Sequence, residues 1–178
     1  KLGFESFVEL GAIRRQRNCY TPADVASFRQ QVVRDLVPLT VKIKERRAKR
    51  LGISDFKFYD NGLNFKDGSA TPQGTPEEIL AAGQTMYEEL SPETRDFIHL
   101  MFENDLFDVL AKEGKAPGGY CTGLPDYGCP FIFSNFNGTS GDVDVLTHEA
   151  GHAFADFIAT ETVKTHALRC PSMEGAET

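Results

Sequence analysis

The spacing of apolar positions predicts two helices in the first third of the chain. Apolar side chains recur at steps of three and four over residues 4–17, which is the period of one helix face. Thr21, followed by proline, is a typical helix start, and the helix it begins extends to about Leu51, where Gly52 ends it. Pro38 lies inside this segment, so we expect a kink there, because proline lacks the N–H of a helical hydrogen bond.

The middle of the chain alternates between strand and helix patterns. Residues 55–61 alternate apolar and polar side chains and predict a short strand. Thr75 caps a helix over residues 77–90, and a Ser-Pro pair starts another over residues 92–114. Apolar residues nearly encircle this last helix, so we expect it to lie in the core, with His99 packed or hydrogen-bonded rather than bound to a metal.

Two further strands and a long helix complete the pattern. The strands are predicted over residues 118–122 and 130–136, joined by a Gly- and Pro-containing stretch that suits a hairpin loop. A helix follows over residues 141–161. The sequence therefore predicts a mainly α-helical fold with a small antiparallel β-sheet just before this helix.

The last helix contains the sequence HEAGH, in which His148 and His152 are four residues apart and Glu149 lies between them. At about 100° per residue, five apolar residues fall on one side of the helix and both histidines on the other. The apolar residues are Val143, Leu146, Ala150, Ala153 and Phe157. Four residues correspond to a rise of about 6 Å, which lets two imidazole nitrogens reach one ion. The pattern predicts a zinc site that opens into a cleft.

A catalytic zinc ion needs a third protein ligand and one open position for water. The extended motif HExxHxxGxxH is excluded, because Ile158 stands where its third histidine would be. A carboxylate after Pro171 is the alternative, since Glu174 and Glu177 share a helix face at a spacing of three. We predict that Glu177 is the third ligand, with Glu174 as the fallback or as a residue that supports the site.

Composition narrows the function classes. The 178 residues carry a net charge of -7, which argues against a nucleic-acid partner because phosphate binding requires a positive surface. No apolar stretch approaches the roughly 18 residues that span a membrane, so we expect no membrane insertion. The four cysteines are too scattered for a disulfide framework. We therefore expect a cytoplasmic protein with free thiols.

Several motifs together resemble one family of zinc peptidases. HEAGH is followed after 24 residues by Glu177 within MEGAET, and the chain also contains GGYC, MYEELSPET and PFIFSNFNGTSGDVDVLTHEAGHAF. These motifs closely resemble the thimet oligopeptidase and oligoendopeptidase F family, nearest to its bacterial oligoendopeptidase F branch. The likeness covers essentially the whole chain from GFESFVELG onward.

The resemblance implies a zincin-like helical metallopeptidase with one zinc ion per chain. The implied zinc ligands are His148, His152 and Glu177, and Glu149 is the implied catalytic carboxylate. Zinc in such a site activates water and polarises a carbonyl group, while the carboxylate takes the water proton and passes it to the leaving amine. The implied reaction is hydrolysis of short oligopeptides at internal bonds.

The resemblance also implies a channel for the substrate. Gly118, Gly119 and Tyr120 would line it together with the strand that contains Phe133 and Asn135, where an edge strand pairs with the peptide backbone. From the residues alone, a flexible turn is the simpler interpretation of the two glycines.

The chain also departs from the family. Members continue beyond the third ligand with a long helical stretch whose histidine and tyrosines help bind substrate, and this sequence has no counterpart of it. We therefore expect residues 1–178 to be one catalytic-domain segment of a larger metallopeptidase, incomplete at both ends and inactive in isolation if that stretch is required. The alternatives are a non-catalytic zinc- or peptide-binding segment and, less favoured, an exopeptidase with the same motif.

Overall fold

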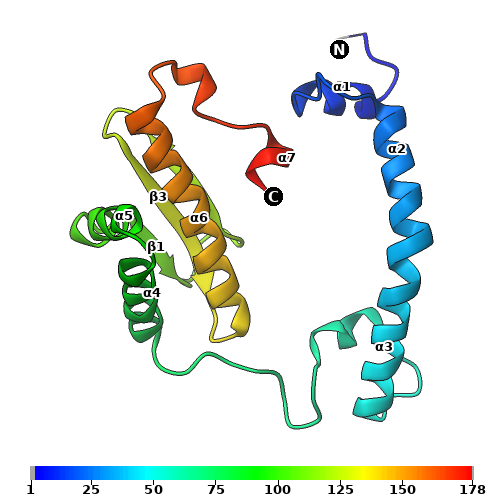
Figure 1. Cartoon of the computed structure of the whole chain (residues 1–178). Helices are drawn as coiled ribbons and strands as arrows, with labels where there is room; N and C mark the ends of the chain where they lie inside the picture. Colours follow the sequence, from blue (N-terminus) through cyan, green and yellow to red (C-terminus); the bar gives the residue numbers. More distant parts are fainter. Residues whose placement is uncertain (1–2, 178) are drawn as a thin grey trace. The chain divides into compact units, whose positions relative to one another are not determined.

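Helices make up most of both structural units into which the chain divides (Figure 1). The computed structural model describes residues 3–177. One unit comprises Lys1–Ser69 with Ser172–Thr178, and the other comprises Ala70–Pro171. The mainly helical fold predicted from the sequence is confirmed.

Among the described residues of the first unit, every regular element is a helix. They are α1 (Phe7–Arg14), α2 (Pro22–Gln31), the π-helical turn η1 (Val32–Leu36), α3 (Val37–Leu51), the 3-10 helix η2 (Phe58–Gly62) and α7 (Met173–Ala176). Thr21 caps α2 by accepting the Asp24 N–H at 3.3 Å, and Gly52 ends α3 in the left-handed region at φ 76°. The irregularity expected at Pro38 takes the form of the widened turn η1 just before it, since a proline ring clashes with the carbonyl one turn earlier.

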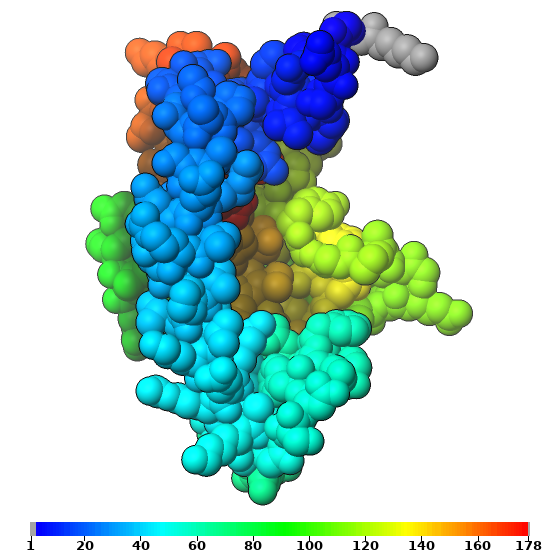
Figure 2. Space-filling model, turned by 90° about the vertical axis from the view of Figure 1, so that its right-hand side faces the viewer, coloured from blue at the N-terminus to red at the C-terminus, as the bar shows by residue number. Residues whose placement is uncertain are grey.

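The long helical segment of this unit buries little of its own surface. None of the residues of α2, η1 and α3 is buried. Figure 2 shows the atoms of this segment, coloured blue to cyan, in full view. Helix caps and backbone hydrogen bonds therefore contribute more to the stability of these helices within the unit than burial of apolar side chains does.

The strand predicted over residues 55–61 is wrong. Phe58–Gly62 forms η2 instead, and Asp60 Oδ2 accepts the backbone N–H of Lys57 at 2.8 Å. Phe58 and Tyr59 are both exposed, so the alternating side chains have no sheet or core to pack against. A local bond from an aspartate to the backbone has replaced strand pairing here.

The second unit places a three-stranded sheet against helices. Its elements are α4 (Pro76–Leu90), α5 (Pro92–Glu103), β1 (Phe107–Leu110), β2 (Tyr120–Leu124), β3 (Cys129–Phe136), α6 (Ser140–Thr162) and the 3-10 helix η3 (His166–Leu168). The strand order is β1-β3-β2. The predicted hairpin is confirmed, because β2 and β3 pair antiparallel from Tyr120↔Phe133 to Leu124↔Cys129.

The helix predicted over residues 92–114 ends early, at Glu103. The Asn104 side chain donates to Leu100 O at 2.9 Å, and Asp105 adopts a left-handed conformation at φ 52° that stops the helix. Phe107–Leu110 then forms β1, which runs parallel to β3. The sheet is therefore mixed, and not purely antiparallel as predicted, because a distant strand supplies a pairing partner that helix propensity cannot anticipate.

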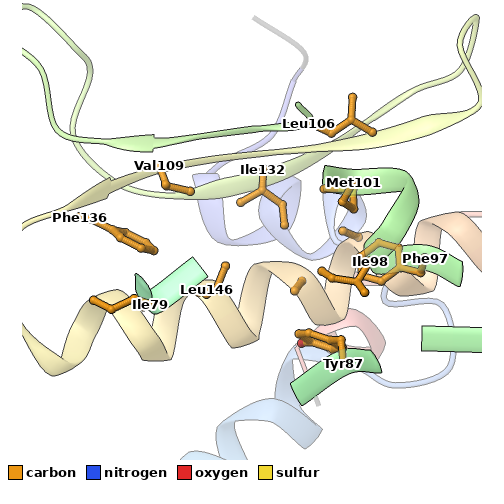
Figure 3. Packing of buried hydrophobic residues seen from close by; sticks show 12 residues of the cluster. Ile79, Tyr87, Phe97, Ile98, Met101, Leu106, Val109, Ile132, Phe136 and Leu146 are labelled. Atoms are coloured by element: carbon orange, nitrogen blue, oxygen red, sulfur yellow. The ribbon is translucent and has the colours of Figure 1, made fainter. Parts of the chain in front are cut away.

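The core of the second unit lies between the sheet and helices α4, α5 and α6 (Figure 3). Its buried apolar residues are Ile79, Tyr87, Phe97, Ile98, Met101, Leu106, Val109, Ile132, Phe136, Leu146, Ala150 and Ala153. The central strand β3 alternates burial along its length, so Ile132 and Phe136 point into this core while Phe133 and Asn135 lie on the other face. This packing fixes α6 relative to β2 and β3.

Replacement of a core leucine of α6 tests this packing. Leu146 is 6% exposed and Leu90, at the end of α4, is 67% exposed. We expect Leu146→Ala to lower the free energy of unfolding by about 2–5 kcal/mol, because it removes buried methyl groups and leaves a cavity. The matched change Leu90→Ala should cost less than about 0.5 kcal/mol. Urea unfolding followed by circular dichroism measures both, and equal midpoints would contradict the assigned core.

Candidate metal and peptide site

The start of α6 is held by Asp142. Its side chain is buried, Oδ1 accepts the Asn137 N–H at 2.9 Å, and Oδ2 accepts the Gly138 N–H at 2.7 Å. A carboxylate in the first turn also interacts favourably with the positive end of the helix dipole. The turn before α6 is therefore tied to the helix at a defined position.

The apolar side of α6 faces the core, largely as predicted. Leu146, Ala150 and Ala153 are buried, and Phe157 packs on Phe97 with ring centroids 5.8 Å apart. The prediction is wrong for Val143, which is 41% exposed because it lies in the first turn, at the edge of the packed region. The remaining contacts still determine which side of the helix is turned away from the core.

His148 and His152 lie on this other side of α6. Their Nε2 atoms are 3.0 Å apart, and their rings are nearly perpendicular, at 83°. Two nitrogens bound to one tetrahedral zinc ion at about 2.0–2.1 Å would be about 3.3 Å apart. His148 is exposed and His152 is half-buried. The spacing and donor type of the two imidazoles therefore fit a pair of zinc ligands reachable from solvent.

Glu149 has a different environment from the histidines beside it. It is only 8% exposed, and its charge acts on the thiol of Cys121 in β2. The carboxyl group is therefore on the part of α6 that faces the sheet, next to β2.

The pKa of the Cys121 thiol reflects the closeness of the α6 carboxylates to β2. Burial, followed by the charges of Asp156 and Glu149 on α6, raises the pKa of Cys121 to about 12. All four cysteines are free thiols, as predicted. Two carboxylates of α6 thus lie close enough to β2 to disfavour a thiolate there.

Glycines allow β2 to approach α6 closely. A Cβ atom at Gly119 would lie 2.9 Å from Val145 Cγ1, and one at Gly123 would lie 2.8 Å from Asp156 Oδ2. Gly118 adopts φ +99°, a conformation that other residues rarely take. Gly119 therefore has a structural requirement, its close approach to Val145, that the flexible-turn interpretation does not explain, whereas the positive φ of Gly118 suits a turn.

The side chains of Tyr120, Phe133 and Asn135 lie on the sheet face that is turned away from α6. Tyr120 stacks on Phe133 with ring centroids 5.0 Å apart. Asn135 Nδ2 donates to Ala116 O at 2.8 Å and to Gly118 O at 2.9 Å. These contacts hold the loop before β2. Direct contact with a peptide stays a prediction.

Sequence reasoning missed Lys115. Its side chain is only 6% exposed, and Nζ donates to Asp108 O and Leu110 O at 2.8 Å each. Nζ also lies 4.4 Å from the centroid of the Phe133 ring, a cation–π contact. Lys115 ties the loop after β1 back to the strand. Nothing in the sequence predicts this, because the acceptors are backbone carbonyls of β1 that only the fold brings near.

The two glutamates near the end of the chain belong to the first unit. Glu177 follows α7 directly, and its backbone N–H donates to Met173 O at 3.1 Å. Glu174 lies within α7 and accepts a hydrogen bond from Arg17 Nε at 2.7 Å. The role of Glu177 as the third ligand stays a prediction from sequence spacing. The pairing of Glu174 with Arg17 shows a role for Glu174 within its own unit.

Comparison with known proteins places these observations in context. The model of peptidase family M3 matches residues 2–178. An oligoendopeptidase F homolog of Lactococcus lactis subsp. lactis (strain IL1403) is 29% identical over 141 residues, covering 76% of this chain and 22% of the relative. The group B oligopeptidase PepB of Streptococcus agalactiae serotype III (strain NEM316) is 30% identical over 139 residues, covering 75% of this chain and 22% of the relative.

Solved structures give a closer match. A protein assigned as an oligoendopeptidase F from Bacillus anthracis str. Ames superimposes with a TM-score of 0.94 at 48% identity, covering 99% of this chain and 32% of that one. PZ peptidase A, in complex with an inhibitor, gives a TM-score of 0.92 at 48% identity, covering 99% of this chain and 31% of that one. The chain thus spans about a fifth of the length of its curated relatives and about a third of these structures.

Alkylation of the cysteines tests the placement of Glu149 and Asp156. With a pKa of about 12, only about one Cys121 thiol in ten thousand is ionised at pH 8. We expect iodoacetamide to label Cys121 at least about 100-fold more slowly than the exposed Cys170, as read by peptide mass spectrometry. Glu149→Gln should speed up labelling of Cys121, because loss of a nearby negative charge lowers the thiol pKa. Equal rates at Cys121 and Cys170 would contradict the description.

Proposed function

The chain belongs to peptidase family M3, and from this premise we propose that it carries the zinc-binding and general-base groups of an endopeptidase that hydrolyses short oligopeptides. The observation that carries the proposal is the pair of converging Nε2 atoms of His148 and His152, 3.0 Å apart, on one side of a helix whose other side is packed in the core. The relatives named as oligoendopeptidases support the choice of reaction.

We propose that His148, His152 and Glu177 bind one zinc ion. Two imidazoles and one carboxylate form a ligand set common in catalytic zinc sites, and they leave one position for water. When bound, zinc lowers the pKa of its water and polarises the scissile carbonyl group. A purely structural zinc site would instead be closed by four ligands, so an open site favours catalysis over the alternative of a non-catalytic zinc-binding segment.

Glu149 acts as the general base in this proposal. Its carboxylate accepts a proton from the attacking water as the water oxygen bonds to the carbonyl carbon, and it passes this proton to the amine nitrogen as the C–N bond breaks. Near-burial of Glu149 next to β2 supports this role, since a carboxylate held away from bulk water has fewer competing proton partners. His148 and His152 would hold the zinc ion through their imidazole nitrogens.

The backbone around Gly118, Gly119 and Tyr120 is the proposed contact for the peptide. A strand at the edge of a sheet offers free N–H and C=O groups to an extended peptide, and β2 is an edge strand. Phe133 and Asn135 contribute through the stack with Tyr120 and the bonds to the loop. Cleavage of peptides blocked at both ends would distinguish this endopeptidase from the alternative of an exopeptidase, because an exopeptidase requires a free terminus.

The proposal also covers the compartment and the partners of the protein. Within residues 3–177, no helix is both long enough and apolar enough to cross a membrane. We propose a cytoplasmic enzyme with oligopeptides as partners and without a nucleic-acid or membrane partner. We also propose that both units belong to one catalytic-domain segment of a larger metallopeptidase, which the family match over residues 2–178 supports.

Glu149→Gln tests the assigned base. In the complete enzyme that contains this chain, we expect turnover of an internally quenched, end-blocked peptide to fall by about 10²–10⁴-fold, because the amide cannot accept the water proton. Zinc content should not change. Glu161→Gln, an exposed glutamate of the same helix, is the matched control and should leave turnover unchanged. A near wild-type rate for Glu149→Gln would remove Glu149 from this role.

Glu177→Ala tests the third ligand. We expect native mass spectrometry to find one zinc ion on the wild-type chain, with retention at least about tenfold weaker in the variant, since one of three protein bonds to the metal is lost. Glu161→Ala controls for removal of a negative charge. Equal zinc retention in all three proteins would rule out Glu177 as a ligand, and no zinc in any of them would contradict the proposed site.

A further inference from the structure

Arg17 and Glu174 join two parts of the first unit that lie 157 positions apart in the sequence. Arg17 Nε donates to Glu174 Oε1 at 2.7 Å, and the side chain of Arg17 is only 17% exposed. The pairing raises the pKa of Arg17 and lowers the pKa of Glu174, so both groups stay charged at neutral pH. This bond connects the segment after α1 with the short helix α7.

Tyr20 completes the contact. The guanidinium of Arg17 lies 5.9 Å from the centroid of the Tyr20 ring, in cation–π range. The Tyr20 hydroxyl also interacts with Glu174 and contributes to lowering its pKa. The three side chains line one hollow of about 510 Å³, together with Arg15 and Arg29. The guanidinium of Arg17 is therefore held between a carboxylate and an aromatic ring.

Helix α7 is a single helical turn. It contains only four residues, Met173–Ala176, well below the length at which a helix is stable by itself. Ser172 caps it by accepting the Gly175 N–H at 3.3 Å, and Glu177 closes its last turn through the bond to Met173 O. Glu174 and Glu177 thus lie at the two ends of a single turn, so fixing Glu174 also restricts Glu177.

We infer that Arg17 is a positioning residue for the proposed metal ligand Glu177, acting through Glu174. This inference rests on the proposed function, in which Glu177 binds zinc. It also gives Glu174 a different role from that of a ligand: its carboxylate anchors α7 to the segment after α1. Preorganisation of a ligand by a partner that does not touch the metal strengthens metal binding, because less conformational freedom is lost when the ion binds.

A peptide carboxylate bound by the arginines of the hollow is the competing interpretation. Three arginines line the hollow, and arginine forms strong bonds to carboxylates. The observed geometry favours positioning, because Arg17 is already engaged by Glu174 and Tyr20. The two interpretations differ in zinc affinity measured without peptide, which only positioning predicts to change.

The experiment is a zinc titration against a chelator of known affinity, without peptide, on four variants and the wild-type chain. Arg17→Gln and Glu174→Gln each remove one partner of the pair, and we expect each to weaken zinc binding about tenfold. The double variant Arg17→Gln/Glu174→Gln should be no weaker than either single variant, since all three lack the same interaction. Arg15→Gln, a neighbouring arginine of the same hollow, should stay within about twofold of wild type.

A second readout separates positioning from general loss of structure. In the cobalt-substituted protein, the visible spectrum reports the number and geometry of ligands, and we expect Arg17→Gln to change it as water replaces Glu177 in part of the molecules. Thermal unfolding of the metal-free Arg17→Gln protein should match that of metal-free Arg15→Gln. An unchanged cobalt spectrum together with a lower unfolding temperature would overturn the positioning role.

The remaining outcomes also decide the question. Wild-type zinc affinity in Arg17→Gln would overturn the inference and leave the proposed function intact. An equal loss in Arg15→Gln and Arg17→Gln would also overturn it, because net charge and not the bond would be responsible. A wild-type chain that binds no zinc would overturn the proposed function, and the inference with it.

Discussion

The burial of one side of α6 is the interaction on which the candidate site depends. Leu146, Ala150 and Ala153 pack against the sheet and the neighbouring helices, and this contact fixes the rotation of the helix about its own axis. Once that rotation is fixed, the 100° step between residues places His148 and His152 away from the core. The chemistry of the site is therefore set by apolar packing that contains no catalytic group.

Close approach of the edge strand is the second constraint. Gly119 and Gly123 place no Cβ atom against Val145 and Asp156 of α6, so β2 lies close to the helix that carries Glu149. Lys115 and Asn135 then hold the loop before the strand through bonds to backbone carbonyls. These features place the proposed general base and the proposed peptide-binding edge in the same structural unit, as orientation of a substrate would require.

Sequence patterns predicted the elements whose signals are local and missed those that depend on distant partners. Periodicity and the hairpin loop predicted α6, β2 and β3, because each pattern spans only neighbouring residues. The strand Phe107–Leu110 was missed because its parallel partner β3 follows later in the chain, and the strand predicted over residues 55–61 failed because Asp60 forms a local cap. The roles of Lys115 and Arg17 were equally invisible, since their acceptors become neighbours only in the folded chain.

X-ray absorption at the zinc edge of the metal-loaded chain is the most direct test of the central claim, that α6 supplies two ligands of an open zinc site. The account predicts two imidazole nitrogens in the first coordination shell, with the remaining positions filled by oxygen at about 2.0–2.2 Å and no sulfur. A shell closed by four protein nitrogen or sulfur atoms, or one with sulfur at about 2.3 Å, would contradict a catalytic site built on His148 and His152.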